Sequence, residues 1–236
     1  MKAGRTMRLA CPHCGRYKCM ESIMGGNTFC GTAWSDSKKE YPMLPSISPI
    51  QRCPKCGAYF FYEEGMLGEL MDENEFKKTL EGINLSQTEI EKQYDKALSK
   101  WFKEADNNGF GHLNEQESRE AYESLYSESL SKQKKTDLLL TRLYAFNDEY
   151  LRNGNTMLPD LQTVQEDFIY KIIELFPNDI VLIAELYREM GQFEKAIELL
   201  RGAIASDLDE KGVEVAKKVL EHAENQDRSV FVVAKW

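Results

Sequence analysis

CPHCG at residues 11–15 and CPKCG at residues 53–57 share one pattern, two cysteines three positions apart with a glycine directly after them. One tight turn of this kind can present two thiolates to a single ion, and glycine accepts the positive φ that points peptide N–H groups toward the sulfurs. Two such turns complete the tetrahedral four-thiolate set that favours zinc. We therefore predict a structural zinc site, and iron or disulfides are the alternatives that the spacing leaves open. The predicted ligands are Cys11, Cys14, Cys53 and Cys56.

The predicted ligands lie in a β-rich module expected to span residues 1–66. Gly25-Gly26-Asn27 is typical of a hairpin turn, and the apolar run Tyr59-Phe60-Phe61-Tyr62 suits a strand. A module of this size cannot be held together by burial alone, so the metal is expected to stabilise the fold.

Three further side chains near the site have open roles. Cys19 and Cys30 can be free thiols facing the core, substitutes in the ligand set or a redox pair. His13 stands between the first two cysteines, where the geometry of the turn disfavours it as a ligand, so we expect it at the surface.

The composition predicts a cytoplasmic chain of two domains with no membrane-spanning segment. The chain has 236 residues, of which 42% are hydrophobic, enough for packed cores. It has no run of 18 apolar residues and no apolar stretch after its basic N-terminal residues, so we expect neither a membrane span nor a secretory signal. Four of the six cysteines stand in C-x-x-C pairs, which indicates a reducing compartment, the cytoplasm.

Charge is divided unevenly along the chain. The formal net charge is −9, yet residues 1–66 carry nine basic and five acidic side chains. Basic residues interleaved with aromatic ones, such as Tyr17 and Trp34, would suit a nucleic acid. The acidic remainder of the chain and the sequence pI of about 5.1 disfavour that partner outside a local patch.

From residue 86 onward the hydrophobic pattern becomes helical. Residues 67–85 are expected to connect the two domains, and Ser86-Gln87-Thr88-Glu89 is a capping box that starts the first long helix. Apolar residues then recur at helical spacing as far as residue 225. The predicted fold is mostly α, with a small N-terminal β zinc ribbon and a C-terminal array of helical hairpins over residues 86–225. Three of its helices are expected near residues 115–131, 133–153 and 161–176.

The stretch Asp106–Glu117 resembles the calcium loop of an EF-hand. Asp106, Asn108 and Glu117 match ligand positions, but Phe110 stands where an oxygen ligand belongs, and we find no second loop. A polar helix–helix turn is the alternative.

The clearest repeat pattern begins after Pro177. Small Ala184 and Ala196 would let two helices approach closely, and Gly191 would end the first of them. Residues 210–225 are predicted to form one more helix that caps the pair. The residues that match a tetratricopeptide repeat are Ala184, Tyr187, Gly191, Phe193, Ala196, Leu200 and Ala203.

The chain as a whole resembles bacterial proteins of uncharacterised activity that couple an N-terminal zinc ribbon to a tetratricopeptide-like helical region. The stretches that carry the resemblance are Gly26-Asn27-Thr28-Phe29, Trp34-Ser35-Asp36 and Pro42-Met43-Leu44-Pro45, which precede the second cysteine pair. The resemblance implies an architecture and no activity.

The tail at residues 226–236 is apolar and β-prone. Left exposed, such a segment would invite aggregation, so we expect it to dock on the edge of the module or on the helices. A tail that binds a partner is the alternative.

Function is predicted as a non-enzymatic interaction or scaffold protein that binds a protein or peptide. Nucleic-acid binding by the zinc module is the alternative. Helical repeats present a groove lined by the first helix of each pair, and here its residues are polar and mostly acidic, which suits a basic segment. The three histidines lie far apart in sequence, and we find no phosphate-binding loop and no nucleophile elbow, so we do not predict an enzyme. The predicted groove residues are Asn178, Val181, Glu185, Arg188 and Glu189.

Overall fold

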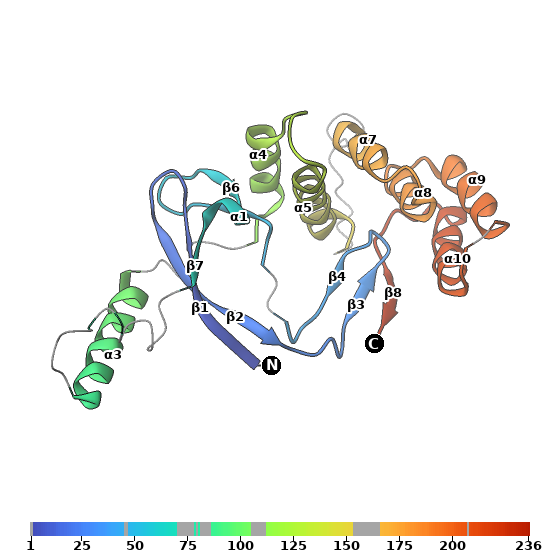
Figure 1. The fold of residues 1–236 in the computed structure, drawn as a ribbon. Helices are drawn as coiled ribbons and strands as arrows, with labels where there is room; N and C mark the ends of the chain where they lie inside the picture. Colours follow the sequence, from blue (N-terminus) through green and yellow to red (C-terminus); the bar gives the residue numbers. More distant parts are fainter. Residues whose placement is uncertain are drawn as a thin grey trace. The chain divides into compact units, whose positions relative to one another are not determined.

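The computed structural model describes residues 2–44, 47–69, 78, 80, 86–104, 112–152, 166–206 and 208–236. The chain divides into two compact units that contain different secondary structure. The first unit comprises Met1–Asn27 with Ile47–His112, and the second comprises Thr28–Ser46 with Leu113–Trp236. The prediction of a mostly helical chain with small antiparallel strands near its N-terminus is confirmed (Figure 1).

The first unit is built on short antiparallel strands. These are β1 (Lys2–Ala10), β2 (Tyr17–Gly25), β5 (Ile50–Arg52), β6 (Tyr59–Phe61) and β7 (Met66–Glu69). One sheet has the order β2-β1-β7, and β5 pairs with β6 in a separate hairpin. The short helix α1 (Tyr62–Gly65) follows β6, and α3 (Gln87–Glu104) is the long helix of this unit.

The two cysteine turns close two equivalent hairpins. At the first, Ala10 of β1 pairs with Tyr17 of β2, and at the second Arg52 of β5 pairs with Tyr59 of β6. The apolar core beside them is small. Its buried members are Leu9, Cys11, Cys53 and Phe60.

A glycine in α1 is pressed against this core. A Cβ at Gly65 would lie 2.5 Å from the Phe60 ring and 2.6 Å from the carbonyl oxygen of Ala10. Gly202, on the exposed side of a helix in the second unit, has no heavy atom within 4 Å of the same position. We therefore expect Gly65→Ala to destabilise the first unit by about 1–3 kcal/mol, whereas Gly202→Ala should stabilise its helix by about 1 kcal/mol. Thermal unfolding of the two variants measures this difference, and equal melting temperatures would contradict it.

Helix α3 begins where the capping box predicts. The backbone N–H of Ser86 donates to Glu89 over 2.8 Å, and its hydroxyl donates to the same carboxylate over 2.6 Å. Of the predicted connecting segment 67–85, the structure describes only residues 67–69, 78 and 80. Residues 67–69 belong to β7 rather than to a connection.

The second unit contains six helices in its described residues. They are α4 (Glu115–Leu125), α5 (Lys132–Tyr150), α7 (Glu166–Leu175), α8 (Ile180–Glu189), α9 (Phe193–Ile204) and α10 (Glu210–Glu224). Leu139 and Leu143 of α5, Ile169 and Ile172 of α7, and Leu186 of α8 are fully buried and form one core.

A three-stranded sheet joins the two ends of this unit. Its strands are β3 (Thr32–Trp34), β4 (Lys39–Glu40) and β8 (Val232–Lys235), in the order β4-β3-β8 (Figure 1). Residues 28–46 therefore belong to the helical second unit. The sequence predicts them to be part of the module 1–66. One of the two partner strands of β3, β8, lies about two hundred residues away along the chain, beyond the reach of local patterns. The tail docks on β3 within the helical unit, one of the two positions expected for it.

The pair α8 and α9 has the predicted small-residue packing. Ala184 and Ala196 are fully buried, and α8 ends at Glu189, two residues before Gly191, whose φ is +78°. A left-handed glycine at this position lets the chain leave a helix without strain. The Gly191 N–H donates to the carbonyl of Arg188 over 2.9 Å, which satisfies one helix-end acceptor.

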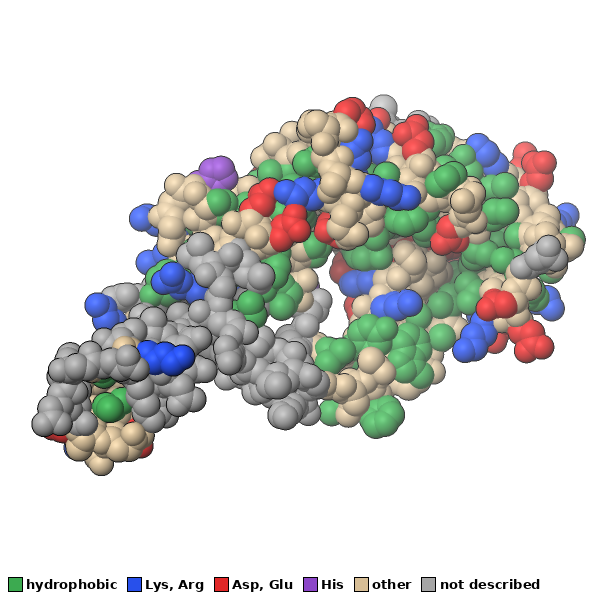
Figure 2. All heavy atoms as spheres, viewed as in Figure 1, with side chains coloured by type: hydrophobic (Ala, Val, Ile, Leu, Met, Phe, Trp, Pro, Cys, Tyr) green, Lys and Arg blue, Asp and Glu red, His purple; other side chains and the backbone are tan. Residues whose placement is uncertain are grey.

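The surface of the helices mixes both signs of charge. Figure 2 shows acidic and basic side chains interspersed over α7–α10 on the face that it presents. Among the described helices, none combines the length and the apolar character needed to cross a bilayer.

Candidate metal centre

The two cysteine turns have the same backbone structure. Cys11 donates its N–H to Arg16 and accepts from Gly15, over 2.8 and 2.9 Å. Cys53 donates to Ala58 and accepts from Gly57, both over 2.9 Å. The glycines have φ values of +70° and +73°. Because a Cβ at Gly15 would have nothing within 4 Å of it, positive φ rather than space explains the glycine there.

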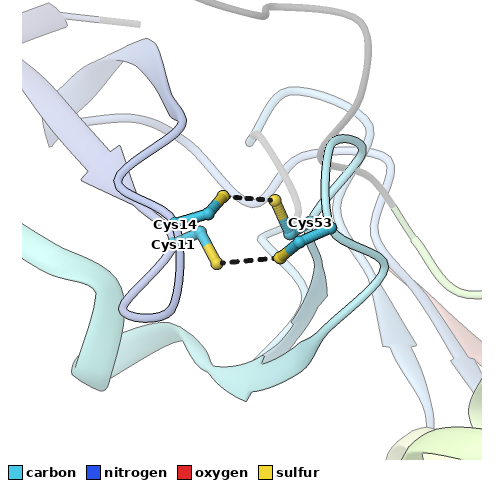
Figure 3. A group of neighbouring side chains, drawn as sticks. Cys11, Cys14 and Cys53 are labelled. Carbon is cyan, nitrogen blue, oxygen red and sulfur yellow. Dashed lines mark hydrogen bonds between the residues drawn. The ribbon is translucent and has the colours of Figure 1, made fainter.

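The four predicted ligands converge on one point. Their sulfurs all lie within 4.8 Å of one another. The Sγ atoms of Cys11 and Cys56 are 3.7 Å apart, and those of Cys14 and Cys53 are 3.5 Å apart (Figure 3). A tetrahedron with metal–sulfur bonds of about 2.3 Å has edges of about 3.8 Å, close to these separations. The cysteines are free thiols, so the disulfide alternative is not what this structure forms. The arrangement fits a metal ion such as zinc.

Burial and backbone hydrogen bonds shift pKa values within the four-cysteine group in opposite directions. Burial raises the pKa of Cys11 to about 12, although hydrogen bonds from the backbone of His13 and Cys14 oppose the shift. Burial also raises the pKa of Cys53. A backbone hydrogen bond from Ala58 lowers the pKa of the exposed Cys56 to about 7. Burial thus keeps Cys11 and Cys53 protonated in the absence of a cation, and a divalent cation replaces their protons when it binds.

Metal binding is therefore expected to release protons. At pH 7 the thiols of Cys11 and Cys53 are protonated, because this pH lies below their raised pKa values, so both protons must leave when the metal binds. The apparent affinity should rise as the pH rises from about 6 to 8, because deprotonation then costs less. Calorimetric zinc titration in two buffers of different ionisation enthalpy counts the protons. Binding without proton release would contradict this expectation.

The other cysteines and His13 do not join the site. Among the described residues, Cys11, Cys14, Cys53 and Cys56 are the only group of His, Cys, Asp and Glu side chains with metal-binding spacing. Cys19 is buried in β2 opposite Arg8, and Cys30 is exposed in the second unit. His13 is exposed on its turn, as expected.

The calcium-loop pattern falls only partly on residues that the structure describes. Asp106–Gly111 lie outside them. Asn114 and Glu117 form the capping box of α4: Glu117 N–H donates to Asn114 over 2.9 Å, and Asn114 N–H donates to the Glu117 carboxylate over 3.2 Å. These two residues of the pattern are thus explained by the start of a helix.

The predicted groove residues differ in their exposure to solvent. Asn178 is exposed and Val181 half-buried, but Glu185, Arg188 and Glu189 are fully buried. Arg188 makes two hydrogen bonds to Glu185, over 2.6 and 2.7 Å, and donates to main-chain carbonyls of the tail. These three side chains lie in the interior and are not exposed to an incoming partner.

A buried polar cluster in the second unit has no counterpart in the sequence patterns. Asp36 is fully buried and accepts hydrogen bonds from Asn147 over 3.0 Å and from Arg152 over 2.5 Å. Asn147 also donates to Glu189 over 3.3 Å. Burial, followed by repulsion from Glu185 and Asp36, raises the pKa of Glu189 well above its usual range. These groups lie far apart in sequence, and no spacing pattern connects them.

Compared with models of known protein families, with curated proteins and with solved structures, the chain has no match.

Proposed function

We propose that this chain is a non-enzymatic zinc-binding interaction protein. Its zinc would be structural, held by Cys11, Cys14, Cys53 and Cys56. The observation that carries the metal assignment is the pair of matching cysteine turns with their sulfurs at near-tetrahedral separations. Four thiolates occupy all four coordination positions of a tetrahedral ion, so none remains for a catalytic water. Free thiolates of this kind persist in a reducing compartment, so the proposal places the protein in the cytoplasm.

The helical unit would bind the protein or peptide partner. The packing of α8 against α9 supports a tetratricopeptide-like hairpin, in which Ala184 of α8 and Ala196 and Leu200 of α9 are fully buried. Helical hairpins of this type commonly serve as binding surfaces rather than as catalytic scaffolds. Two large apolar side chains on this part of the surface, Tyr170 and Ile180, are 37% and 40% exposed.

Site-specific photo-crosslinking in the native host tests this proposal. A photoreactive phenylalanine analogue replaces Tyr170 or Ile180, both exposed, and Lys217 on α10 serves as the matched exposed control. We expect one discrete protein adduct from Tyr170 or Ile180 and none from Lys217. The same faint background from all three positions would contradict the proposal.

Nucleic-acid binding by the first unit is the second candidate. Two arginine–tyrosine pairs flank the cysteine turns: Arg8 lies 5.3 Å from the ring centre of Tyr17, and Arg52 lies 5.9 Å from that of Tyr59. Such pairs can stack bases and contact phosphates. Single-stranded oligonucleotide binding over a salt series tests this candidate, since phosphate contacts make the affinity fall steeply with salt. Absence of binding at low salt would eliminate it.

A further inference from the structure

The tail crosses the second unit as an extended chain held by its main chain. The guanidinium of Arg188 donates through Nη1 to the carbonyl of Asp227 and through Nη2 to that of Ser229, the latter over 2.9 Å. The same guanidinium forms a buried ion pair with Glu185, which fixes its orientation. A rigid, buried donor of this kind recognises the backbone of a segment whatever its side chains are.

Other elements extend this main-chain recognition. Ser35 donates its N–H to the carbonyl of Phe231 over 2.9 Å, and its hydroxyl accepts from the Phe231 N–H over 3.2 Å. Lys218 of α10 donates to the carbonyl of Val233 over 2.9 Å. Beyond these contacts the tail becomes β8 and adds to β3 as an antiparallel strand.

Side chains of the tail enter separate apolar surroundings. Val230 is 5% exposed and packs with Phe146 and Leu151. Phe231 packs into the cluster formed by α8, α9 and α10, and its ring stacks on His222 with centres 3.7 Å apart. Val230 and Phe231 thus occupy different clusters, as neighbouring side chains of an extended peptide do.

Main-chain hydrogen bonds together with pockets for successive side chains define peptide recognition by strand addition. We propose that the surface formed by Arg188, Ser35 and β3 is a peptide-binding site which the tail at residues 227–236 occupies in cis. Its partner is an extended protein segment with the pattern of Val230, Phe231 and Val233. An apolar residue is followed directly by an aromatic residue, and a second apolar residue stands two positions after the aromatic one. This inference rests on the proposed function, because it names the partner class of the helical unit.

The tail has features that suit exchange with such a partner. Gln226, where the tail leaves α10, has a φ of +53°, a conformation that a residue with a side chain adopts at some cost. At the other end, Ala234 and Lys235 are exposed, whereas Trp236 donates its N–H to the carbonyl of Gly31 over 3.1 Å and its ring centre lies 5.8 Å from that of Tyr41. A tethered segment competes at an effective concentration that is commonly in the millimolar range, so weakening the tail should raise the apparent affinity for a partner.

A labelled peptide tests the site in the full-length protein. The probe is a fluorescein-labelled peptide with the sequence of residues 226–236, and binding is followed by fluorescence anisotropy. We expect the Phe231→Ala chain to bind it at least about tenfold more tightly than the wild type, because the peptide restores the missing ring. Lys217→Ala, which truncates an exposed side chain of α10 beside Lys218 but with no contact to the tail among those described, should bind like the wild type. A peptide with alanine in place of its phenylalanine should bind at least about tenfold more weakly than the probe.

Lys218→Met gives a second, milder variant in case Phe231→Ala does not fold. It removes one bond to the tail and no core side chain, so a smaller gain in affinity is expected. If both variants are folded by circular dichroism and neither binds the peptide more tightly than the wild type, the inference is overturned. Concentration-dependent dimers of the wild type that dissociate on adding peptide would assign the site to a second copy and also overturn it. If Tyr170 or Ile180 gives a crosslinked adduct but neither variant binds the peptide more tightly than the wild type, the proposed function stands and only this binding site is ruled out.

Discussion

Cys53→Ser is expected to abolish metal binding and to unfold the β-structure of the first unit. Cys53 is fully buried, and its sulfur faces that of Cys14 across the site. A structural zinc of this type contributes on the order of 10–16 kcal/mol to folding, and the small core around Leu9 and Phe60 cannot replace that contribution. Metal analysis together with amide chemical shifts of β1 and β2 measures both effects.

Cys30→Ser is the matched control for this substitution. Cys30 is exposed and its sulfur lies outside the metal-binding group, so this variant should keep its full metal content. Equal metal loss in the two variants would mean that a different set of cysteines holds the ion. An unchanged metal content in Cys53→Ser would contradict the proposed site.

Arg188→Met is expected to produce the largest loss of stability in the second unit. The substitution leaves Glu185 fully buried without its ion-pair partner, and it removes the donor to the carbonyls of Asp227 and Ser229. Breaking a buried pair by removing one partner costs about 3–5 kcal/mol, because the remaining charge stays buried. Urea unfolding followed by circular dichroism measures this loss.

Arg201→Ala provides the comparison. Arg201 also pairs with a glutamate, Glu224 at 2.8 Å, but the two side chains are 66% and 47% exposed. An exposed pair contributes only about 0–1 kcal/mol, so this variant should unfold close to the wild type. Similar losses in Arg188→Met and Arg201→Ala would show that the burial of Arg188 does not determine its contribution.

The cluster of four cysteines was predictable because its information is local. Each turn is specified within five residues, and Gly15 and Gly57 adopt the positive φ that the pattern requires. The start of α3 and the positive φ of Gly191 after α8 follow from equally short patterns. The spacing of the cysteines alone was enough to predict that the four sulfurs meet.

The buried positions in the second unit were not predictable for the opposite reason. Glu185, Arg188 and Glu189 are polar, so their sequence favours a solvent-facing groove. They are buried because their partners come from distant parts of the chain: Arg188 donates to carbonyls some forty residues later, and Glu189 accepts from Asn147 some forty residues earlier. Residues 28–46 likewise have distant partners, since β3 pairs with β8 and Asp36 accepts hydrogen bonds from Asn147 and Arg152.

X-ray absorption at the zinc edge of the purified, reduced protein tests the central claim most directly. We predict one zinc per chain with four sulfur neighbours at about 2.3 Å. A first shell that contains nitrogen or oxygen ligands, or a folded β-module that carries no metal, would contradict it.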